Sequence, residues 1–149
     1  MENIKELRKR YIKLYPDDGI NKVDLDKIEV NLGVELPKDF CEIALFYGGE
    51  LLSGIDTFSF SCDKTNTNII AETIRIRSAI GLPSRFIVLG EPPESLIVMD
   101  TENTPSIIWC DAMDVSRLDD NSFISKTDKW NTYLEFFIEL LEEEEEQME

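Results

Sequence analysis

The sequence of 149 residues contains no histidine, the side chain that most often acts as a general base near neutral pH. Triads of the Ser-His-Asp and Cys-His types are therefore excluded. The three cysteines, Cys41, Cys62 and Cys110, are widely spaced and form no Cys-x-x-Cys pair. We expect reduced core thiols, with no disulfide framework and no zinc site. Glycine-rich phosphate-binding motifs are also missing, so no metal and no cofactor is expected.

The chain also lacks long apolar runs. No stretch reaches the roughly 18 apolar residues that a membrane span requires, which argues against a membrane protein. The first residues alternate charged and apolar side chains and contain no continuous apolar segment of a secretory signal. A cytoplasmic protein is therefore expected.

Basic residues are few: Lys and Arg number 15 against 31 Asp and Glu, and the net charge is −16. The excess lies in residues 78–149, with 4 basic and 17 acidic residues, whereas residues 1–77 have 11 and 14. A negative field repels nucleic acid and anionic lipid and favours association with a basic protein. Acidity that serves only solubility explains the charge about equally well.

Helical spacing dominates the N-terminal third of the sequence. Apolar residues recur every three or four positions over 2–15, which predicts an amphipathic helix. Asp24 is expected to cap a short second helix. Pro37 suits the first position of a third helix, and Gly48-Gly49 can supply its left-handed exit.

Strand-like runs follow these helices. Residues 55–60 predict a first strand, and a helix capped by Thr67 or Asn68 comes next. Three β-branched, apolar runs then occur in quick succession, with connections too short for a crossover helix, so we expect antiparallel pairing. These runs are residues 86–89, 96–99 and 107–110, and a weaker run at 115–118 would add an edge strand.

The last expected element is a helix that begins near Asp128 and presents a broad apolar face as far as Leu141. Beyond it only Met148 is apolar, so the glutamates of 142–149 are expected to fray into solvent. Residues 1–149 thus predict one α+β domain. Its antiparallel sheet of about four to six strands would be covered by N-terminal, middle and C-terminal helices.

Acidic side chains are concentrated between residues 91 and 120, which contain eight Asp and Glu residues and one basic residue, Arg117. Several fall in turns at strand ends, which are common binding positions on a rigid scaffold. We expect them to form a partner-binding surface along one sheet edge, with a solvated acidic rim as the alternative. The candidates are Glu91, Glu94, Asp100, Glu102, Asp111, Asp114, Asp119 and Asp120. Trp109 could anchor a partner, but its apolar strand favours core packing.

Paired carboxylates are the catalytic arrangement that this composition still allows. Asp100 with Asp111, at the ends of adjacent strands, and Asp119 with Asp120 are the candidate pairs. In a chain with 31 acids such pairs arise by chance. Nothing in the sequence indicates a buried carboxyl with the raised pKa that a general acid needs. We therefore expect no enzyme.

Several short segments follow one another in a recognisable order. They are residues 28–40 with Tyr47-Gly48-Gly49, residues 69–77 with 82–90, residues 96–100, residues 107–110, and Ser122-Phe123 with 133–137. In this order they resemble the SUKH superfamily, over about residues 24–141. That superfamily includes the yeast cell-wall synthesis regulators of the Smi–Knr type and many bacterial immunity proteins.

The resemblance implies an α+β fold without catalytic residues and an intracellular role in binding proteins. Bacterial members typically inhibit the nuclease or other toxic domains of polymorphic toxins. Such domains are often basic, so the acidic half of this chain would complement one. The leading hypothesis is an immunity protein for a basic toxin domain, acting as a monomer or weak homodimer. An interaction scaffold like the yeast relatives is the alternative, and a carboxylate enzyme comes third.

Overall fold

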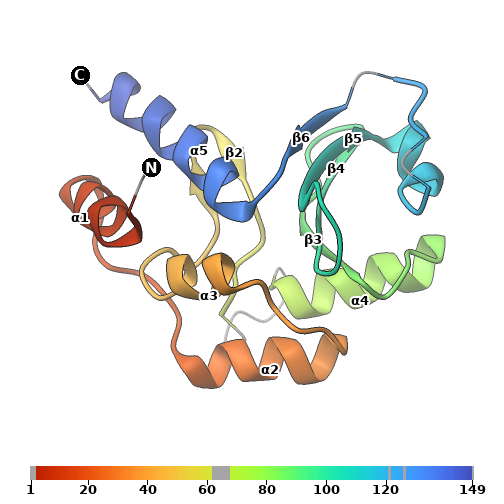
Figure 1. Cartoon of the computed structure of the whole chain (residues 1–149), viewed down its shortest axis with the longest axis horizontal. Coiled ribbons are helices and arrows are strands. Elements are labelled where there is room, and N and C mark those ends of the chain that lie inside the picture. The colour runs from red at the N-terminus through yellow and green to blue at the C-terminus, as the bar shows by residue number, and fades with distance from the viewer. Residues whose placement is uncertain (1–2, 62–67, 121, 126, 149) are drawn as a thin grey trace.

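The computed structural model describes residues 3–61, 68–120, 122–125 and 127–148, and it confirms the predicted α+β class (Figure 1). The elements in chain order are α1 (Ile4–Leu14), α2 (Lys22–Leu32), α3 (Lys38–Ala44), β1 (Leu51–Leu52), β2 (Ile55–Asp56), α4 (Ile69–Ile80), β3 (Phe86–Gly90), β4 (Ser95–Asp100), β5 (Ile107–Asp111), the 3-10 helix η1 (Ala112–Arg117), β6 (Asp128–Trp130) and α5 (Tyr133–Gln147). Among the described helices, none has the length and apolar character needed to cross a membrane.

The main sheet has the strand order β3-β4-β5-β6, with antiparallel neighbours throughout the described part of the chain. Val98 in β4 pairs with Val88 on one side and Ile108 on the other. The antiparallel pairing predicted for the three apolar runs is therefore confirmed. Strands β1 and β2 pair only with each other and form a second, smaller sheet in the described part of the chain.

Both faces of the main sheet are covered, which explains why its strands are continuous apolar runs. Ile97 and Met99 face one cluster, which α1, α2, α3 and α5 complete. Leu96 and Val98 alternate with them and face a second cluster with Ile76 of α4. Figure 1 shows α3 and α5 on one side of the sheet and the cyan 3-10 helix on the other.

The edge of this sheet differs from the predicted one. The proposed edge strand at 115–118 is wrong, since Val115 to Arg117 belong to η1. The Asp111 carboxylate accepts a hydrogen bond from the Met113 amide and so caps this helix in place of a strand. The edge strand is instead β6, which pairs with β5.

The start of the last helix must be corrected for the same reason. Residues from Asp128 to Trp130 form β6, and α5 begins at Tyr133. Its N-cap is Thr132, whose hydroxyl accepts a hydrogen bond of 3.1 Å from the Glu135 amide. Thr-x-x-Glu is the spacing of a capping box, so this boundary was readable in the sequence.

Two N-terminal boundaries also differ in detail. Asn21, not Asp24, caps α2, because the Asp24 amide donates to the Asn21 side chain. Pro37 occupies the N-cap of α3 instead of its first helical position. Asn68 caps α4 as predicted, while the alternative cap Thr67 lies outside the described residues.

Gly48-Gly49 does not form the exit of α3, which already ends at Ala44. Gly49 does have a positive φ of 86°, and a Cβ there would lie 2.4 Å from the Phe58 carbonyl oxygen. This close approach requires glycine where the chain enters the β1-β2 hairpin.

The strand predicted over residues 55–60 is only partly regular. Ile55–Asp56 pairs with Leu51–Leu52 as a hairpin whose turn residues, Ser53 and Gly54, both have positive φ. The chain beyond it runs along β3, where the Phe58 amide donates to the Leu89 carbonyl at 2.8 Å. The hairpin is thus fixed beside the main sheet.

The expected fraying of 142–149 is wrong for the described residues, because α5 continues to Gln147. Glu144 is only 8% exposed and accepts hydrogen bonds from the Tyr15 hydroxyl and the Ser53 amide. Glu145 forms an ion pair with Arg10 of α1. The glutamates find donors on neighbouring elements, which a pattern based on apolar residues cannot reveal.

The prediction of reduced core thiols is confirmed for Cys110, whereas Cys41 is only partly buried against the core. Cys41 and Cys110 are free thiols, and Cys62 lies outside the described residues. Burial raises the pKa of the Cys110 thiol to about 11, so this thiol is neutral at physiological pH.

Candidate protein-binding groove

The eight acidic residues predicted to share one surface are divided between the two ends of β4. Antiparallel pairing places Asp111 opposite Ser95, so Glu91, Glu94 and Asp111 belong to one end. Asp100 lies at the other end, roughly 17 Å away at 3.4 Å per residue. Asp100 and Asp111 therefore do not form the carboxylate pair considered for catalysis.

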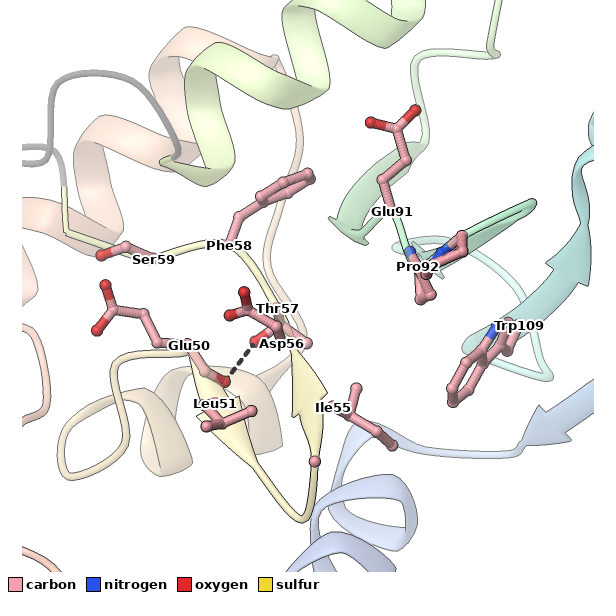
Figure 2. Close-up of a pocket in the computed structure, with 12 residues that line it drawn as sticks. Glu50, Leu51, Ile55, Asp56, Thr57, Phe58, Ser59, Glu91, Pro92 and Trp109 are labelled. Carbon is pink, nitrogen blue, oxygen red and sulfur yellow. Dashed lines mark hydrogen bonds between the residues drawn. The ribbon is translucent and has the colours of Figure 1, made fainter.

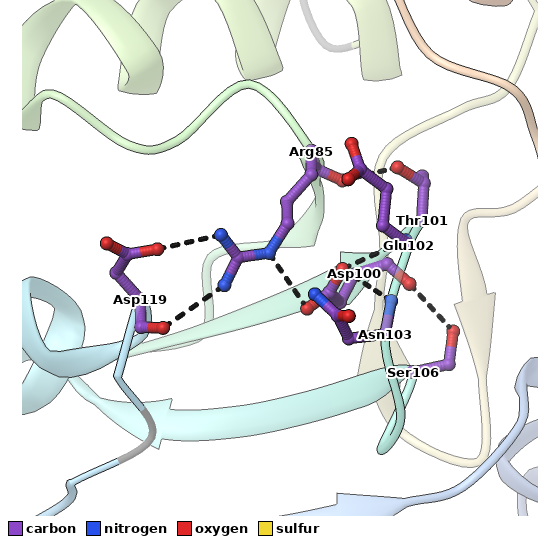
Figure 3. Close-up of polar contacts among 7 residues, drawn as sticks. All are labelled: Arg85, Asp100, Thr101, Glu102, Asn103, Ser106 and Asp119. Atoms are coloured by element: carbon purple, nitrogen blue, oxygen red, sulfur yellow. Dashed lines mark hydrogen bonds and ion pairs between the residues drawn. The ribbon is translucent and has the colours of Figure 1, made fainter.

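Asp100 and Asp119 are joined by Arg85 (Figure 3). The Arg85 guanidinium lies 3.1 Å from Asp100 and 2.7 Å from Asp119. Asp100 is 6% exposed and also accepts hydrogen bonds from the backbone amides of Glu102 and Asn103. Its carboxylate holds the β4-β5 turn, so it is not available on the surface.

Asp114 also has a structural role and is not available on the surface. It is fully buried and accepts hydrogen bonds from the Ile124 and Ser125 amides, which lower the pKa of its carboxyl. Asp120 is exposed, and a hydrogen bond from the Ser122 hydroxyl lowers its pKa. The remaining predicted residues stay accessible: Glu91, Glu94, Glu102 and Asp119 are exposed, and Asp111 is half-buried.

Glu91 is the predicted acid that lines a groove of about 540 Å³ (Figure 2). The β1-β2 hairpin and the chain that follows it form one wall. The turn after β3, with Glu91, Pro92 and Pro93, forms the other wall, and Trp109 of β5 lies at its end. We call this feature the hairpin groove.

Trp109 is half-buried, which bears out core packing for part of its side chain. Part of the indole packs against the inner core cluster, and part lines the hairpin groove. Its Nε1–H donates a hydrogen bond of 2.9 Å to the Ser95 hydroxyl on the neighbouring strand. The ring is held in place by this bond, and Figure 2 shows it across the groove from Ile55.

The lining of the hairpin groove is negatively charged. It contains the carboxylates of Glu50, Asp56 and Glu91 and, among the described residues, no Lys or Arg. Two adjoining hollows of about 460 and 490 Å³ also border Glu50 and are equally without basic lining residues. Carboxylates that line a concave surface concentrate its negative potential.

Arg75 is the base that borders this surface. Its guanidinium lies 2.7 Å from Glu91 and 3.2 Å from Glu72. Both pairs raise the pKa of Arg75, and its side chain is half-exposed. An exposed pair of this kind is weak, so Glu91 remains open to exchange with another cation.

The hairpin wall is positioned by polar contacts with α5 and by a hydrogen bond within the wall itself. The Ser53 amide and hydroxyl donate to Glu144 and Glu143 of α5, at 2.7 and 2.9 Å. The Thr57 hydroxyl donates to the Glu50 carbonyl at 3.3 Å, drawn as a dashed line in Figure 2. The groove is therefore preformed.

Sequence reasoning places a strand over residues 55–60, which includes β2, but it misses β1 and the turn that joins the two strands. The available signal was Ser53-Gly54 between apolar residues, a typical hairpin turn. Leu51 beside it is 66% exposed, which is unusual for a large apolar side chain next to a core.

An apolar centre with a polar, charged rim is the usual anatomy of a protein-binding surface. The groove carboxylates Glu50 and Asp56 are exposed. Within the described residues no cluster of three or more His, Cys, Asp or Glu side chains has the geometry to hold a metal ion. The fold is an α+β domain, and the hairpin groove is its candidate site for binding a protein.

The family model SUKH_5, described as SMI1-KNR4 cell-wall, matches residues 1–142. The chain belongs to this family, and the match includes α1, which lay outside the resemblance noted over 24–141. Membership supports an immunity-protein or Smi1/Knr4-like role in general, and the family is generally non-enzymatic. A comparison with curated proteins finds no match.

Proposed function

We propose that this chain is a cytoplasmic immunity protein that binds a cognate polymorphic toxin and neutralises it by protein–protein interaction, without catalysis. Its partner would be a basic toxin domain, of the kind that acts on nucleic acid. Family membership supports the general role. The acidic hairpin groove is the observation that carries the choice of a basic partner.

The charge of the groove matches what a nuclease-type domain must present. A protein that grips a phosphate backbone does so with Lys and Arg, which leave a basic surface when no nucleic acid is bound. Carboxylates on a concave surface attract such a partner and raise the association rate. The apolar centre, with Trp109 and Ile55, then slows dissociation by excluding water.

A second candidate is an intracellular regulator that binds several cellular proteins. The description of the matched family as SMI1-KNR4 cell-wall favours it. The two roles predict different effects on the cell when the gene for this chain is deleted. Loss of an immunity protein harms the cell only when its toxin is present, whereas loss of a regulator alters growth without any toxin.

A two-step experiment tests the proposal. A tagged chain is used to capture partners from its native cell, and the captured proteins are identified by mass spectrometry. The basic domain of a captured protein is then assayed for nuclease activity with increasing amounts of this chain. We expect inhibition that is complete near equimolar ratio. A captured domain whose activity is unaffected, or capture of several cell-wall proteins instead, would contradict the immunity role.

A further inference from the structure

We propose that the hairpin groove receives an extended segment of the partner that carries an arginine side chain, and that this side chain stacks on Trp109. The inference rests on the proposed function, because it specifies which part of a basic partner the groove recognises.

The shape of the groove suits a single segment of chain. A volume of about 540 Å³ holds a few side chains and is too small for a folded element with its own core. Next to the groove the backbones of its two walls approach closely, since a Cβ at Gly90 would lie 3.3 Å from the Asp56 carbonyl oxygen.

The lining of the groove offers both apolar surface and negative charge, and one type of side chain can contact both. Trp109, Ile55 and Pro92 provide apolar surface, and the carboxylates of Asp56 and Glu91 lie beside it. Arginine and lysine have an apolar stem and a cationic end, so they can bury the first while they pair with the second. A purely apolar segment would leave the carboxylates unpaired, and an acidic segment would be repelled by them.

Trp109 favours arginine over lysine. Its Nε1–H is already bonded to Ser95, so the ring contributes its face to the groove and not its donor. A guanidinium stacks on an indole face and can still donate hydrogen bonds in its own plane to carboxylates. Among the described residues Asp56 has no ion-pair partner, and it is exposed at the hairpin wall.

The hairpin groove should lose little conformational entropy when it binds such a segment. Pro92 and Pro93 stiffen one wall. Glu144 and Glu143 fix the turn of the hairpin that forms the other. A preformed site loses less conformational entropy on binding, so even a short segment can be held.

The test uses Trp109 as its own reporter. The chain has 2 tryptophans, so Trp130→Phe leaves Trp109 as the source of indole fluorescence. Short peptides of alternating glycine and arginine, or glycine and lysine, are titrated into this variant of the full chain. We expect a saturable change in Trp109 emission and binding of the arginine peptide about fivefold tighter than the lysine peptide.

Three further variants locate the binding. Asp56→Asn removes a groove carboxylate and should weaken the arginine peptide by about threefold. Glu102→Gln is the matched control, since this exposed acid lies at the opposite end of β4 and should leave the affinity unchanged. Trp109→Phe should reduce the preference for arginine while keeping an aromatic ring in the strand, and its peptide affinities are measured by calorimetry because the substitution removes the fluorescent reporter.

Equal affinity for the two peptides would overturn the proposal that the groove binds an arginine-containing segment. Equal losses of affinity in Asp56→Asn and Glu102→Gln would overturn it as well. Such a result leaves the immunity role intact, because toxin inhibition is measured independently. Conversely, selective arginine binding without inhibition of any captured domain would contradict the immunity role and leave the groove assignment standing.

Discussion

The amide of Ser53, at the turn of the β1-β2 hairpin, donates a hydrogen bond of 2.7 Å to the Glu144 carboxylate, 91 residues away in sequence. Glu144 also accepts a hydrogen bond from the Tyr15 hydroxyl of the segment after α1. One buried carboxylate thus connects the hairpin, the N-terminal segment and the end of α5. The position of the groove wall depends on this contact.

Replacing Glu144 should therefore destabilise the protein. In Glu144→Ala the Ser53 amide and the Tyr15 hydroxyl lose their acceptor, and we expect a loss of about 1–3 kcal/mol. Urea unfolding followed by circular dichroism measures the change. Glu142→Ala is the matched control on the exposed face of the same helix and should change stability by less than about 0.5 kcal/mol. Equal effects in the two variants would mean that the terminal glutamates do not anchor the hairpin.

Arg75 and Arg85 each pair with two carboxylates, but they should contribute differently to the free energy of unfolding. Arg85 is mostly buried and pairs with Asp100 and Asp119, whereas Arg75 is half-exposed. Arg85→Met leaves the buried Asp100 without its cation and should cost about 1–3 kcal/mol. Arg75→Met should cost less than about 1 kcal/mol, because exposed pairs are weak.

The measurement is again urea unfolding, for both variants at the same ionic strength. Raising the salt concentration should reduce the small effect at Arg75 more than the larger effect at Arg85, since buried pairs are less screened. A larger loss in Arg75→Met than in Arg85→Met would contradict the placement of the network in Figure 3.

Acid should weaken the fold through specific carboxylates. Hydrogen bonds from the Ile124 and Ser125 amides lower the pKa of Asp114, and the Arg10 guanidinium lowers that of Glu145. Because the folded-state pKa is the lower one, these groups stabilise the fold above the ordinary carboxyl pKa. That stability is lost as the pH falls through their folded-state values.

We therefore expect the free energy of unfolding to fall as the pH is lowered below about 4, in urea titrations between pH 7 and pH 3. Asp114→Asn should be less stable than the wild type at pH 7 and should lose less stability on acidification. A parallel pH profile in this variant would show that the buried Asp114 does not contribute.

Charge reversal in the groove should slow association with a basic partner. Asp56→Lys with Glu91→Lys reverses two lining charges, and Glu102→Lys with Asp120→Lys reverses two exposed charges elsewhere. We expect the first pair to lower the association rate by about tenfold or more at low salt, with a smaller difference at high salt. Stopped-flow binding with the captured domain measures both rates.

Much of the fold could be predicted from the sequence, because it follows local patterns. Helical spacing indicated the first helix, and the three apolar runs with short turns indicated the antiparallel sheet. The boundary at Thr132 is also encoded locally, by the Thr-x-x-Glu spacing of a capping box. Errors arose where a polar side chain, such as Asp111 as a cap, overrides an apolar pattern.

The groove could not be predicted in the same way, because it depends on contacts between distant parts of the chain. Nothing near Ser53 in the sequence indicates that Glu144 accepts its amide hydrogen. The cluster of acids at 91–120 predicted one acidic surface, yet pairing in the sheet separates its members, and Asp100 and Asp114 are buried. Only Glu91 of that set lines the groove.

The central claim is that this chain neutralises a basic toxin domain through the hairpin groove. The most direct measurement is the nuclease activity of the captured domain at equimolar wild-type chain, compared with Asp56→Lys/Glu91→Lys and with Glu102→Lys/Asp120→Lys. We predict inhibition by the wild type and by the second double variant, with activity retained in the presence of the first. Equal inhibition by all three proteins would contradict the assignment of the groove, and inhibition by none would contradict the immunity role itself.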